Sequence, residues 1–317
     1  MKQILCIGEA LIDMICTDKG RALSDGDHFL KKAGGAPTNV AAAIAALGGE
    51  AVLAAKVGRD PFGQHLISTM KDFGVKTDGV IEAAEQFTTF AFVSLMENGE
   101  RDFYFNRGAD GQLSVAEVDR LSLDQTAIVH FGSATAFLPG PLQDAYRHLL
   151  DKASDAGRYI SFDPNYRHLL FRDNLKSFVE QSWNFLQRCD FFKVSDEEAL
   201  LLTGKDNISE AAQALLERTT AVFAITIGKE GTLLGRKGKL EKIASIPVKP
   251  VDTTGAGDAF VGAVLYQLSQ YDATARKKLG DEDWQRIITN GNKAGARTCE
   301  YLGAMEAFRH LNNEIFR

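Results

Sequence analysis

The sequence predicts an α/β fold in which a mostly parallel central sheet is covered by helices on both faces. Short apolar or β-branched segments alternate with longer segments of helical character over most of the 317 residues. This alternation is typical of a parallel sheet, because parallel strands need a crossover connection, usually a helix. Hydrophobic residues make up 45% of the chain, which is enough for a large core. We therefore expect one α/β domain over residues 1–317.

The predicted strands are short and apolar, and helical segments separate them. They are residues 4–7, 51–57, 128–131, 159–162, 191–194 and 222–227. Between the first strands, residues 38–47 are rich in alanine and residues 62–73 have helical spacing. Pro139 favours the first turn of a further helix. Residues 232–243 have the pattern of a hairpin, and a strongly helical run begins near Ala259.

Two segments do not fit the parallel sheet. Residues 12–33 lack a clear helix, and residues 87–107 alternate β-forming side chains around the turn sequence ENGE. Strands that cannot join the parallel sheet can form a small sheet of their own. Such a sheet would serve as a flap over a cleft, or it would be an extra hairpin at the edge of the main sheet. The pattern alone favours neither.

Charge and composition argue against several classes of protein. The formal net charge is −6 without a long basic run, which argues against nucleic acid as a partner. No apolar stretch reaches the length of about 18 residues that a membrane helix needs, and the first residues lack the features of a secretory signal. The four cysteines have neither CxxC spacing nor a nearby histidine. We therefore expect reduced thiols and a cytoplasmic protein.

The glycine-rich turn at residues 252–258, DTTGAGD, directly precedes the last helical run. Its two glycines let the main chain approach a ligand closely. The helix start behind them presents unpaired N–H groups and the positive end of the helix dipole, which suits phosphoryl oxygens. Asp258 falls in the first helical turn, where a carboxylate can accept a proton from an attacking hydroxyl. The alternative is that this turn only caps the helix.

Other nucleotide-binding motifs are missing from the sequence. It contains no G-x-x-x-x-G-K-[ST], and it lacks the glycine loop, HRD and DFG of protein kinases. It also lacks a G-x-G-x-x-G after the first strand, which argues against a dinucleotide dehydrogenase.

Six motifs resemble, in the same order, those of the ribokinase-like (PfkB) carbohydrate kinases. They are GEALIDMI at 8–15, GGAPTNVA at 34–41, KVGRDPFG at 56–63, FDPNYR at 162–167, TIGKEGTLL at 226–234 and DTTGAGDAF at 252–260. The resemblance covers nearly the whole chain. It implies a ribokinase-like three-layer sandwich with a small β lid built from two insertions, about residues 12–33 and 87–107. It also implies ATP and Mg²⁺ as cofactors for phosphorylation of a sugar hydroxyl.

The resemblance implies a role for individual residues. The general base matches Asp258, and the anion hole matches Gly255, Ala256 and Gly257. The sugar-binding acid, di-glycine turn and amide match Asp13, Gly34, Gly35 and Asn39. The loop that lines the nucleotide phosphates and ribose, and the residue near the adenine, match Thr226, Gly228, Gly231 and Asn292. Carboxylate, amide and main-chain N–H groups are suitable partners for a polyol.

The expected metal ligands depart from the family pattern. Members usually carry Asn-x-x-Glu for indirect Mg²⁺ binding, whereas this chain has Ser195 and Glu198 at those positions. Glu197 would replace Glu198 if the helix register differed. The alternative is a helix start rich in acidic residues, which the dipole favours in any case. Asp252 and Thr254 match positions whose carbonyl groups hold a monovalent cation, such as K⁺, in many members.

Fructose is the substrate that the resemblance favours. Pro37 and FYFNRGAD at 103–110 are most similar to bacterial fructokinases, so we expect Phe105, Arg107 and Arg167 to contact the sugar. A 2-keto-3-deoxygluconate kinase is the first alternative, because two arginines can hold a carboxylate. Aminoimidazole-riboside kinase and ribokinase are the others. Arg107 could instead be a surface charge, and Phe105 could pack the lid or a dimer interface.

A catalytically silent relative that binds sugar or nucleotide is the alternative outside enzymes. The intact Asp258 and Gly-Ala-Gly turn argue against it. We also expect a homodimer, because exposed edges of lid strands can pair across a two-fold axis.

Overall fold

A central sheet of nine strands crosses the computed structural model, which describes residues 2–95 and 101–316. In spatial order the strands are β13 (Lys239–Ile243), β12 (Thr232–Arg236), β11 (Val222–Thr226), β10 (Phe191–Ser195), β9 (Tyr159–Phe162), β8 (Thr126–Phe131), β1 (Gln3–Ile7), β4 (Ala51–Gly58) and β5 (Lys76–Ala83). All neighbouring pairs from β5 to β11 are parallel. The hairpin of β12 and β13 adds two antiparallel strands. The predicted, mostly parallel sheet is confirmed.

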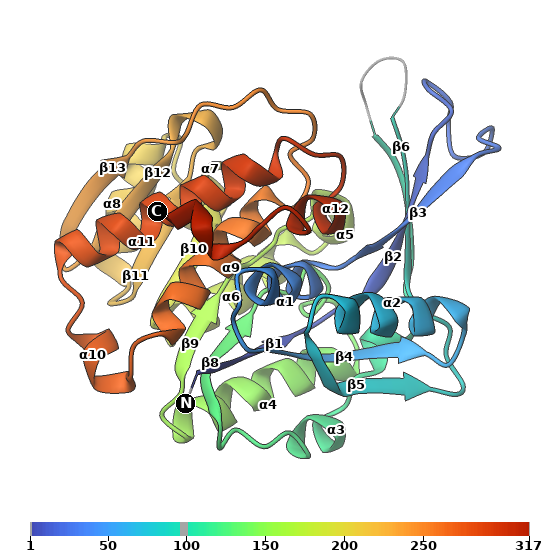
Figure 1. Cartoon of the computed structure of the whole chain (residues 1–317), viewed down its shortest axis with the longest axis horizontal. Coiled ribbons are helices and arrows are strands. Elements are labelled where there is room, and N and C mark those ends of the chain that lie inside the picture. Colours follow the sequence, from blue (N-terminus) through green and yellow to red (C-terminus); the bar gives the residue numbers. More distant parts are fainter. Residues whose placement is uncertain (1, 96–100, 317) are drawn as a thin grey trace.

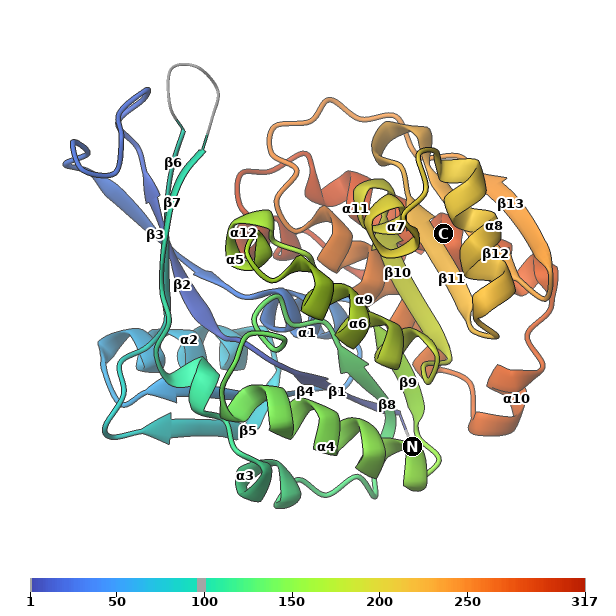
Figure 2. The same ribbon diagram turned by 180° about the vertical axis from the view of Figure 1, so that it is seen from behind.

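Helices cover both faces of this sheet (Figures 1 and 2). One face carries α1 (Ala36–Ala46), α2 (Pro61–Asp72), α9 (Ala256–Ser269), α11 (Asp281–Thr298) and α12 (Ala304–Phe308). The other carries α3 (Val115–Asp119), α4 (Pro141–Asp155), α6 (Leu175–Leu186), α7 (Asp196–Thr203) and α8 (Ile208–Arg218). Ile4 and Cys6 of β1 pack into the first core and Leu5 and Ile7 into the second, because successive side chains of a strand point to opposite faces. The result is a three-layer sandwich.

A second sheet projects from one side of the sandwich (Figures 1 and 2). Its strands, in spatial order, are β3 (Phe29–Gly34), β2 (Leu11–Cys16), β6 (Phe90–Leu95) and β7 (Arg101–Asn106). The β2–β6 pair is parallel, and the outer pairs are antiparallel. The two segments that did not fit the main sheet therefore pair with each other. The predicted turn at ENGE lies outside the described residues.

Two predicted helix starts move by a few residues. Helix α1 begins at Ala36 rather than residue 38, with Pro37 in its first turn. Helix α4 begins at Pro141 rather than Pro139, because Gly140, with φ 136°, precedes the first helical residue. The remaining short elements are α5 (His168–Phe171), α10 (Ala273–Lys277) and the 3-10 turns at Ala109–Gln112, Gly228–Glu230 and Asn313–Phe316. Within residues 2–95 and 101–316, no helix combines the length and apolar character of a membrane span.

Candidate active site

The glycine-rich turn leads directly into α9. Gly255 adopts φ 81°, and a Cβ at this position would lie 2.4 Å from the Cβ of Ala304, so both conformation and packing require glycine. Helix α9 begins at Ala256, and Asp258 lies in its first turn. The first N–H groups of a helix have no acceptor within it, and the positive end of its dipole lies there. The turn therefore has the local structure of an anion site.

Asp258 is buried and is held by a residue from α1. Nδ2 of Asn39 donates a hydrogen bond of 2.8 Å to Oδ2 of Asp258, across 219 positions of sequence. Burial raises the pKa of Asp258, whereas the bond from Asn39 and the charges of Arg167 and Lys193 lower it. The buried Oδ1 of Asn39 has no hydrogen-bond partner in the described part of the chain. That oxygen can accept a hydrogen bond from a hydroxyl group of a ligand.

Asp13 lies on β2, beside the glycine pair at the end of β3. A Cβ on Gly34 would lie 2.1 Å from Oδ2 of Asp13, so the carboxylate occupies the space that a side chain would need. Gly35 adopts φ 107°, and a Cβ there would lie 2.4 Å from the main-chain oxygen of Glu9. Burial raises the pKa of Asp13 to about 7, although the charge of Arg167 acts in the opposite direction. The glycine pair thus makes room for an acidic group.

The positive charge of Arg167 acts on both carboxylates, those of Asp13 and Asp258. Its charge lowers the pKa of Asp13 and that of Asp258. It directly precedes α5, and its Nη1 donates 3.1 Å to the carbonyl oxygen of Tyr166. The structure therefore brings Asp13, Asn39, Arg167 and Asp258 together from four separate elements. Together they gather carboxylates, an amide and a cation near the start of α9, and these groups can form hydrogen bonds with hydroxyl groups.

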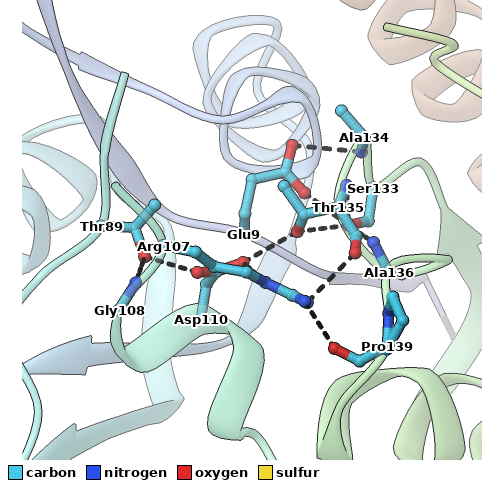
Figure 3. Close-up of polar contacts among 10 residues, drawn as sticks. All are labelled: Glu9, Thr89, Arg107, Gly108, Asp110, Ser133, Ala134, Thr135, Ala136 and Pro139. Atoms are coloured by element: carbon cyan, nitrogen blue, oxygen red, sulfur yellow. Dashed lines mark hydrogen bonds and ion pairs between the residues drawn. The ribbon is translucent and has the colours of Figure 1, made fainter. Parts of the chain in front are cut away.

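Arg107 is bonded to the loop before α4 (Figure 3). Its Nη1 donates a hydrogen bond of 2.8 Å to the carbonyl oxygen of Pro139, and its Nη2 donates one of 3.1 Å to the carbonyl oxygen of Thr135. Its Nε lies 3.5 Å from Oδ2 of Asp110. The guanidinium group therefore ties the end of β7 to the loop before α4. The contact of Arg107 with a sugar therefore stays a prediction. The ring of Phe105 stacks on Phe103 with centroids 6.3 Å apart, which agrees with the alternative of packing within the second sheet.

A buried chain of polar groups connects the base of the second sheet to α1 (Figure 3). Asp110 accepts hydrogen bonds from the hydroxyl groups of Thr89 and Thr135, the latter at 2.8 Å. Ser133 lies 3.4 Å from Thr135 and donates to the carboxylate of Glu9. Glu9 in turn accepts 2.9 Å from the N–H of Ala36, the first residue of α1. Sequence reasoning missed this network, because its members are dispersed single residues.

The predicted nucleotide loop follows β11. Thr226 ends that strand, and its hydroxyl lies 3.4 Å from the carbonyl oxygen of Val194. Gly228 and Gly231 have φ 50° and 104°, and both are therefore in the conformation that favours glycine. Asn292 is buried in α11, where its Oδ1 accepts 2.7 Å from Thr232. Because its Nδ2 also donates 3.1 Å to the carbonyl of Ala244, its contact with adenine stays a prediction.

The predicted Mg²⁺ segment forms the start of α7. Oγ of Ser195 accepts a hydrogen bond of 3.1 Å from the N–H of Glu198, and Oε2 of Glu198 accepts one of 2.7 Å from the N–H of Ser195. These two reciprocal bonds form a capping box. Oε1 of Glu198 accepts 2.8 Å from the N–H of Tyr166. Glu197 is exposed, so the register makes Glu198 the buried acid. Because both of its carboxylate oxygens accept hydrogen bonds from the main chain, Glu198 is better placed to bind a metal ion through a water molecule than to ligate the ion directly.

The predicted monovalent-cation segment is fixed by a side chain. Oδ1 of Asp252 accepts two hydrogen bonds from Thr254, one of 3.0 Å from its N–H and one of 2.7 Å from its hydroxyl group. Oδ2 of Asp252 accepts a hydrogen bond of 2.8 Å from the N–H of Gly303. Within residues 2–95 and 101–316, no three His, Cys, Asp or Glu side chains gather as a metal site. A cation here would depend on main-chain oxygens, so the roles of Asp252 and Thr254 stay predictions.

Two buried charged residues near Asp258 were missed from the sequence. Lys193 lies in β10 and Asp163 directly follows β9, and Nζ of Lys193 is 3.3 Å from Oδ2 of Asp163. The signal was available for Lys193, because a charged residue interrupts the apolar strand FFKVS.

Comparison with known proteins gives consistent relatives. Residues 1–310 match the family described as pfkB family carbohydrate kinase. Fructokinase-1 from Oryza sativa subsp. japonica is 36% identical over 309 residues, which cover 95% of this chain and 93% of that one. Probable fructokinase-4 from Arabidopsis thaliana is 35% identical over 309 residues, which cover 96% of this chain and 93% of that one.

Solved structures agree with the sequence relatives. The fructokinase from Xylella fastidiosa with bound ATP has a TM-score of 0.87 at 30% identity and covers 99% of this chain and 97% of that one. The fructokinase from Vibrio cholerae in its fructose, ADP and calcium ion bound form has a TM-score of 0.84 at 30% identity and covers 100% of this chain and 98% of that one. The central sheet, the projecting sheet and the turn at α9 are therefore those of a member of the pfkB family of carbohydrate kinases, to which this chain belongs.

Proposed function

We propose that this carbohydrate kinase is a fructokinase, which transfers the γ-phosphoryl group of ATP to a hydroxyl group of fructose. The observation that carries the proposal is the position of Asp258, buried in the first turn of α9 and bonded to Asn39. Fructokinases from Oryza sativa subsp. japonica and Vibrio cholerae, similar to this chain over 93% and 98% of their lengths, support fructose as the acceptor.

Asp258 acts as the general base in this proposal. It accepts the proton of the sugar hydroxyl while the hydroxyl oxygen bonds to phosphorus and the bond from phosphorus to the ADP oxygen breaks. The hydroxyl group loses its proton late in a loose transition state, so a carboxylate can serve as the base. N–H groups at the start of α9, from Gly257 and its neighbours, donate to the phosphoryl oxygens. Mg²⁺, when bound, shields the charge of the phosphates.

The sugar is held by residues around Asp258. Asp13 accepts hydrogen bonds from sugar hydroxyl groups, and the unpartnered Oδ1 of Asn39 accepts another. Gly34 and Gly35 let the sugar approach the main chain, and Arg167 adds a donor. Thr226, Gly228 and Gly231 line the nucleotide. Glu198 would hold Mg²⁺ through water, and main-chain oxygens near Asp252 and Thr254 would hold K⁺.

Formation of ADP with a panel of four sugars tests the proposal. Fructose, 2-keto-3-deoxygluconate, aminoimidazole riboside and ribose are each supplied with ATP and Mg²⁺. We expect the highest kcat/KM with fructose, and a loss of about 10²–10⁴ in kcat for Asp258→Ala with sugar and ATP affinity within a few-fold. Asp119→Ala, at an exposed ion pair with His148, is the matched control. Binding without turnover of any sugar would instead identify a silent relative.

We also propose that two copies of the chain pair through the second sheet. Large apolar side chains are exposed on its strands, among them Leu30 of β3, Leu95 of β6 and Tyr104 of β7. Paired copies would cover these side chains and satisfy the open strand edges. Light scattering should then give a mass twice that of the chain. A monomer at micromolar concentration would contradict this proposal.

A further inference from the structure

Lys193 is a largely buried cation that lies beside the first turn of α9. Phe191 packs into the core on the α9 side of the sheet, and Phe192 and Val194 pack into the opposite core. Alternation along β10 therefore directs Lys193 toward α9. A Cβ on Gly257 would lie 3.2 Å from Nζ of Lys193, so the ammonium group reaches the first turn of α9. The positive end of that helix repels a cation and attracts an anion.

The ion pair of Lys193 does not account for all of its hydrogen-bonding capacity. An ammonium group carries three N–H donors, and Asp163 is its one ion-pair partner in the described part of the chain. Their separation of 3.3 Å is longer than that of a charge-assisted hydrogen bond, about 2.7–2.9 Å. Lys193 is only 7% exposed, so water offers it little compensation. The N–H donors are therefore available to a ligand at the helix start.

Asp163 is oriented by a hydrogen bond from a residue two positions further along the chain. Its Oδ1 accepts 3.2 Å from the N–H of Asn165, which adopts the left-handed φ of 48°. Nδ2 of Asn165 is fixed by a bond of 2.7 Å to the carbonyl oxygen of Gly132. Burial alone would lower the pKa of Lys193, but Asp163, Glu198 and Asp258 together raise it, so the side chain keeps its charge.

We propose that Lys193 is a further catalytic residue of this kinase, which donates hydrogen bonds to the oxygens of the transferred phosphoryl group at the start of α9, and that Asp163 positions it. The inference rests on the proposed function. During transfer the bond from phosphorus to the ADP oxygen breaks as the bond to the sugar oxygen forms. Negative charge then lies on the phosphoryl oxygens, which the fixed cation stabilises. Lys193 neither gains nor loses a proton.

The decisive variant is Lys193→Met, which keeps the length and apolar body of the side chain. Loss of one such donor typically lowers kcat by about 10²–10³. We further expect affinity for the β,γ-imido analogue of ATP to fall at least about fivefold, because Lys193 meets the terminal phosphate. Affinity for ADP should stay within about twofold. If Lys193 served only folding, the folded variant would keep the wild-type kcat and the wild-type affinity for the analogue.

Lys56→Met is the matched control. Lys56 also forms a largely buried ion pair, 2.6 Å from Glu117, but with a residue of α3 on the other side of the sheet. It should leave kcat and both nucleotide affinities unchanged within about twofold. The double variant Lys193→Met/Asp163→Asn removes both charges, which avoids an unpaired buried carboxylate if the single variant does not fold. It should show the same loss in kcat.

Asp163→Asn separates positioning from contact. It keeps the cation but loosens it, so kcat should fall less than in Lys193→Met and analogue affinity should fall by less than about threefold. Unchanged kcat and unchanged analogue affinity in folded Lys193→Met would overturn the proposal. Wild-type protein that phosphorylates none of the four sugars would instead contradict the proposed function, so the two failures are distinguishable.

Discussion

Nδ2 of Asn39 lies 2.8 Å from Oδ2 of Asp258, and this bond joins the first turns of two helices whose N-terminal ends meet at the site. Asn39 follows the glycine pair beside Asp13, whereas Asp258 follows the glycine-rich turn. The amide fixes one carboxylate oxygen and leaves its own oxygen for a ligand. In the proposed mechanism the same residue thus orients the base and binds the hydroxyl group from which the base takes a proton.

Removal of the Asn39 amide should leave a smaller fraction of Asp258 ionised. Asn39→Ala deletes a bond that lowers the pKa of Asp258, so that pKa should rise further above its usual value. Because the ionised form is the active base, the acid limb of the kcat profile should move to higher pH. At pH values on that limb, kcat should fall about tenfold, the worth of a hydrogen bond to a charged group. An acid limb at the wild-type pH would show that the amide does not tune Asp258.

Sugar affinity should depend on pH through Asp13. The pKa of this carboxyl is about 7, because burial raises it and Glu9 adds a like charge, although Arg167 opposes both. The ionised form accepts hydrogen bonds from the sugar, so KM for fructose should rise by up to about tenfold for each pH unit below 7 and level off above it. Asp13→Asn should have a high KM that does not vary between pH 5.5 and pH 8, values about 1–1.5 units either side of that pKa. A pH-independent wild-type KM would contradict this assignment.

Gly34 should not tolerate even a methyl group. In Gly34→Ala the new Cβ would meet Oδ2 of Asp13 at 2.1 Å, which forces the carboxylate to move. We expect KM for fructose to rise at least about tenfold, with ATP affinity unchanged, because a displaced positioning group costs several hydrogen bonds. Gly280→Ala is the control, since its Cβ would find Asp283 at 3.8 Å. Equal sugar affinity in both variants would place Asp13 away from the sugar.

Asp110 should be important for stability. It is 1% exposed and accepts from Thr89 and Thr135, so Asp110→Ala leaves two buried hydroxyl groups and Arg107 without an acidic partner. The free energy of unfolding in urea should fall by about 2–4 kcal/mol. Asp119→Ala removes an acid that is 52% exposed and should cost at most about 0.5 kcal/mol. A loss in Asp110→Ala as small as that would show that the network is not stabilising.

The sequence predicted most strands of the central sheet and the turn at α9, because their signals are local, but it missed β5 (Lys76–Ala83), whose side chains are mostly polar or only partly buried. Short apolar runs mark the strands, and two glycines before a helical run mark the turn. The pairing of β2 with β6 was not predictable in the same way, because Ile12 and Phe90 are far apart in the sequence and several strands and helices lie between them. Arg107 shows the same limit, since its partners Thr135 and Pro139 lie in a loop whose path no local pattern indicates.

The short connection between β1 and β2 has a mechanical consequence. Only residues 8–10 separate Ile7, in the central sheet, from Leu11, in the projecting sheet, and Glu9 is anchored in the polar chain between them. Rocking of the projecting sheet would have to bend the chain at this connection, which serves as one pivot. Asp13, two positions beyond the pivot, would travel through a small arc while the far tip swings widely. Such a motion would carry the far ends of the strands much further than the Asp13 carboxylate, which would keep its place beside Gly34.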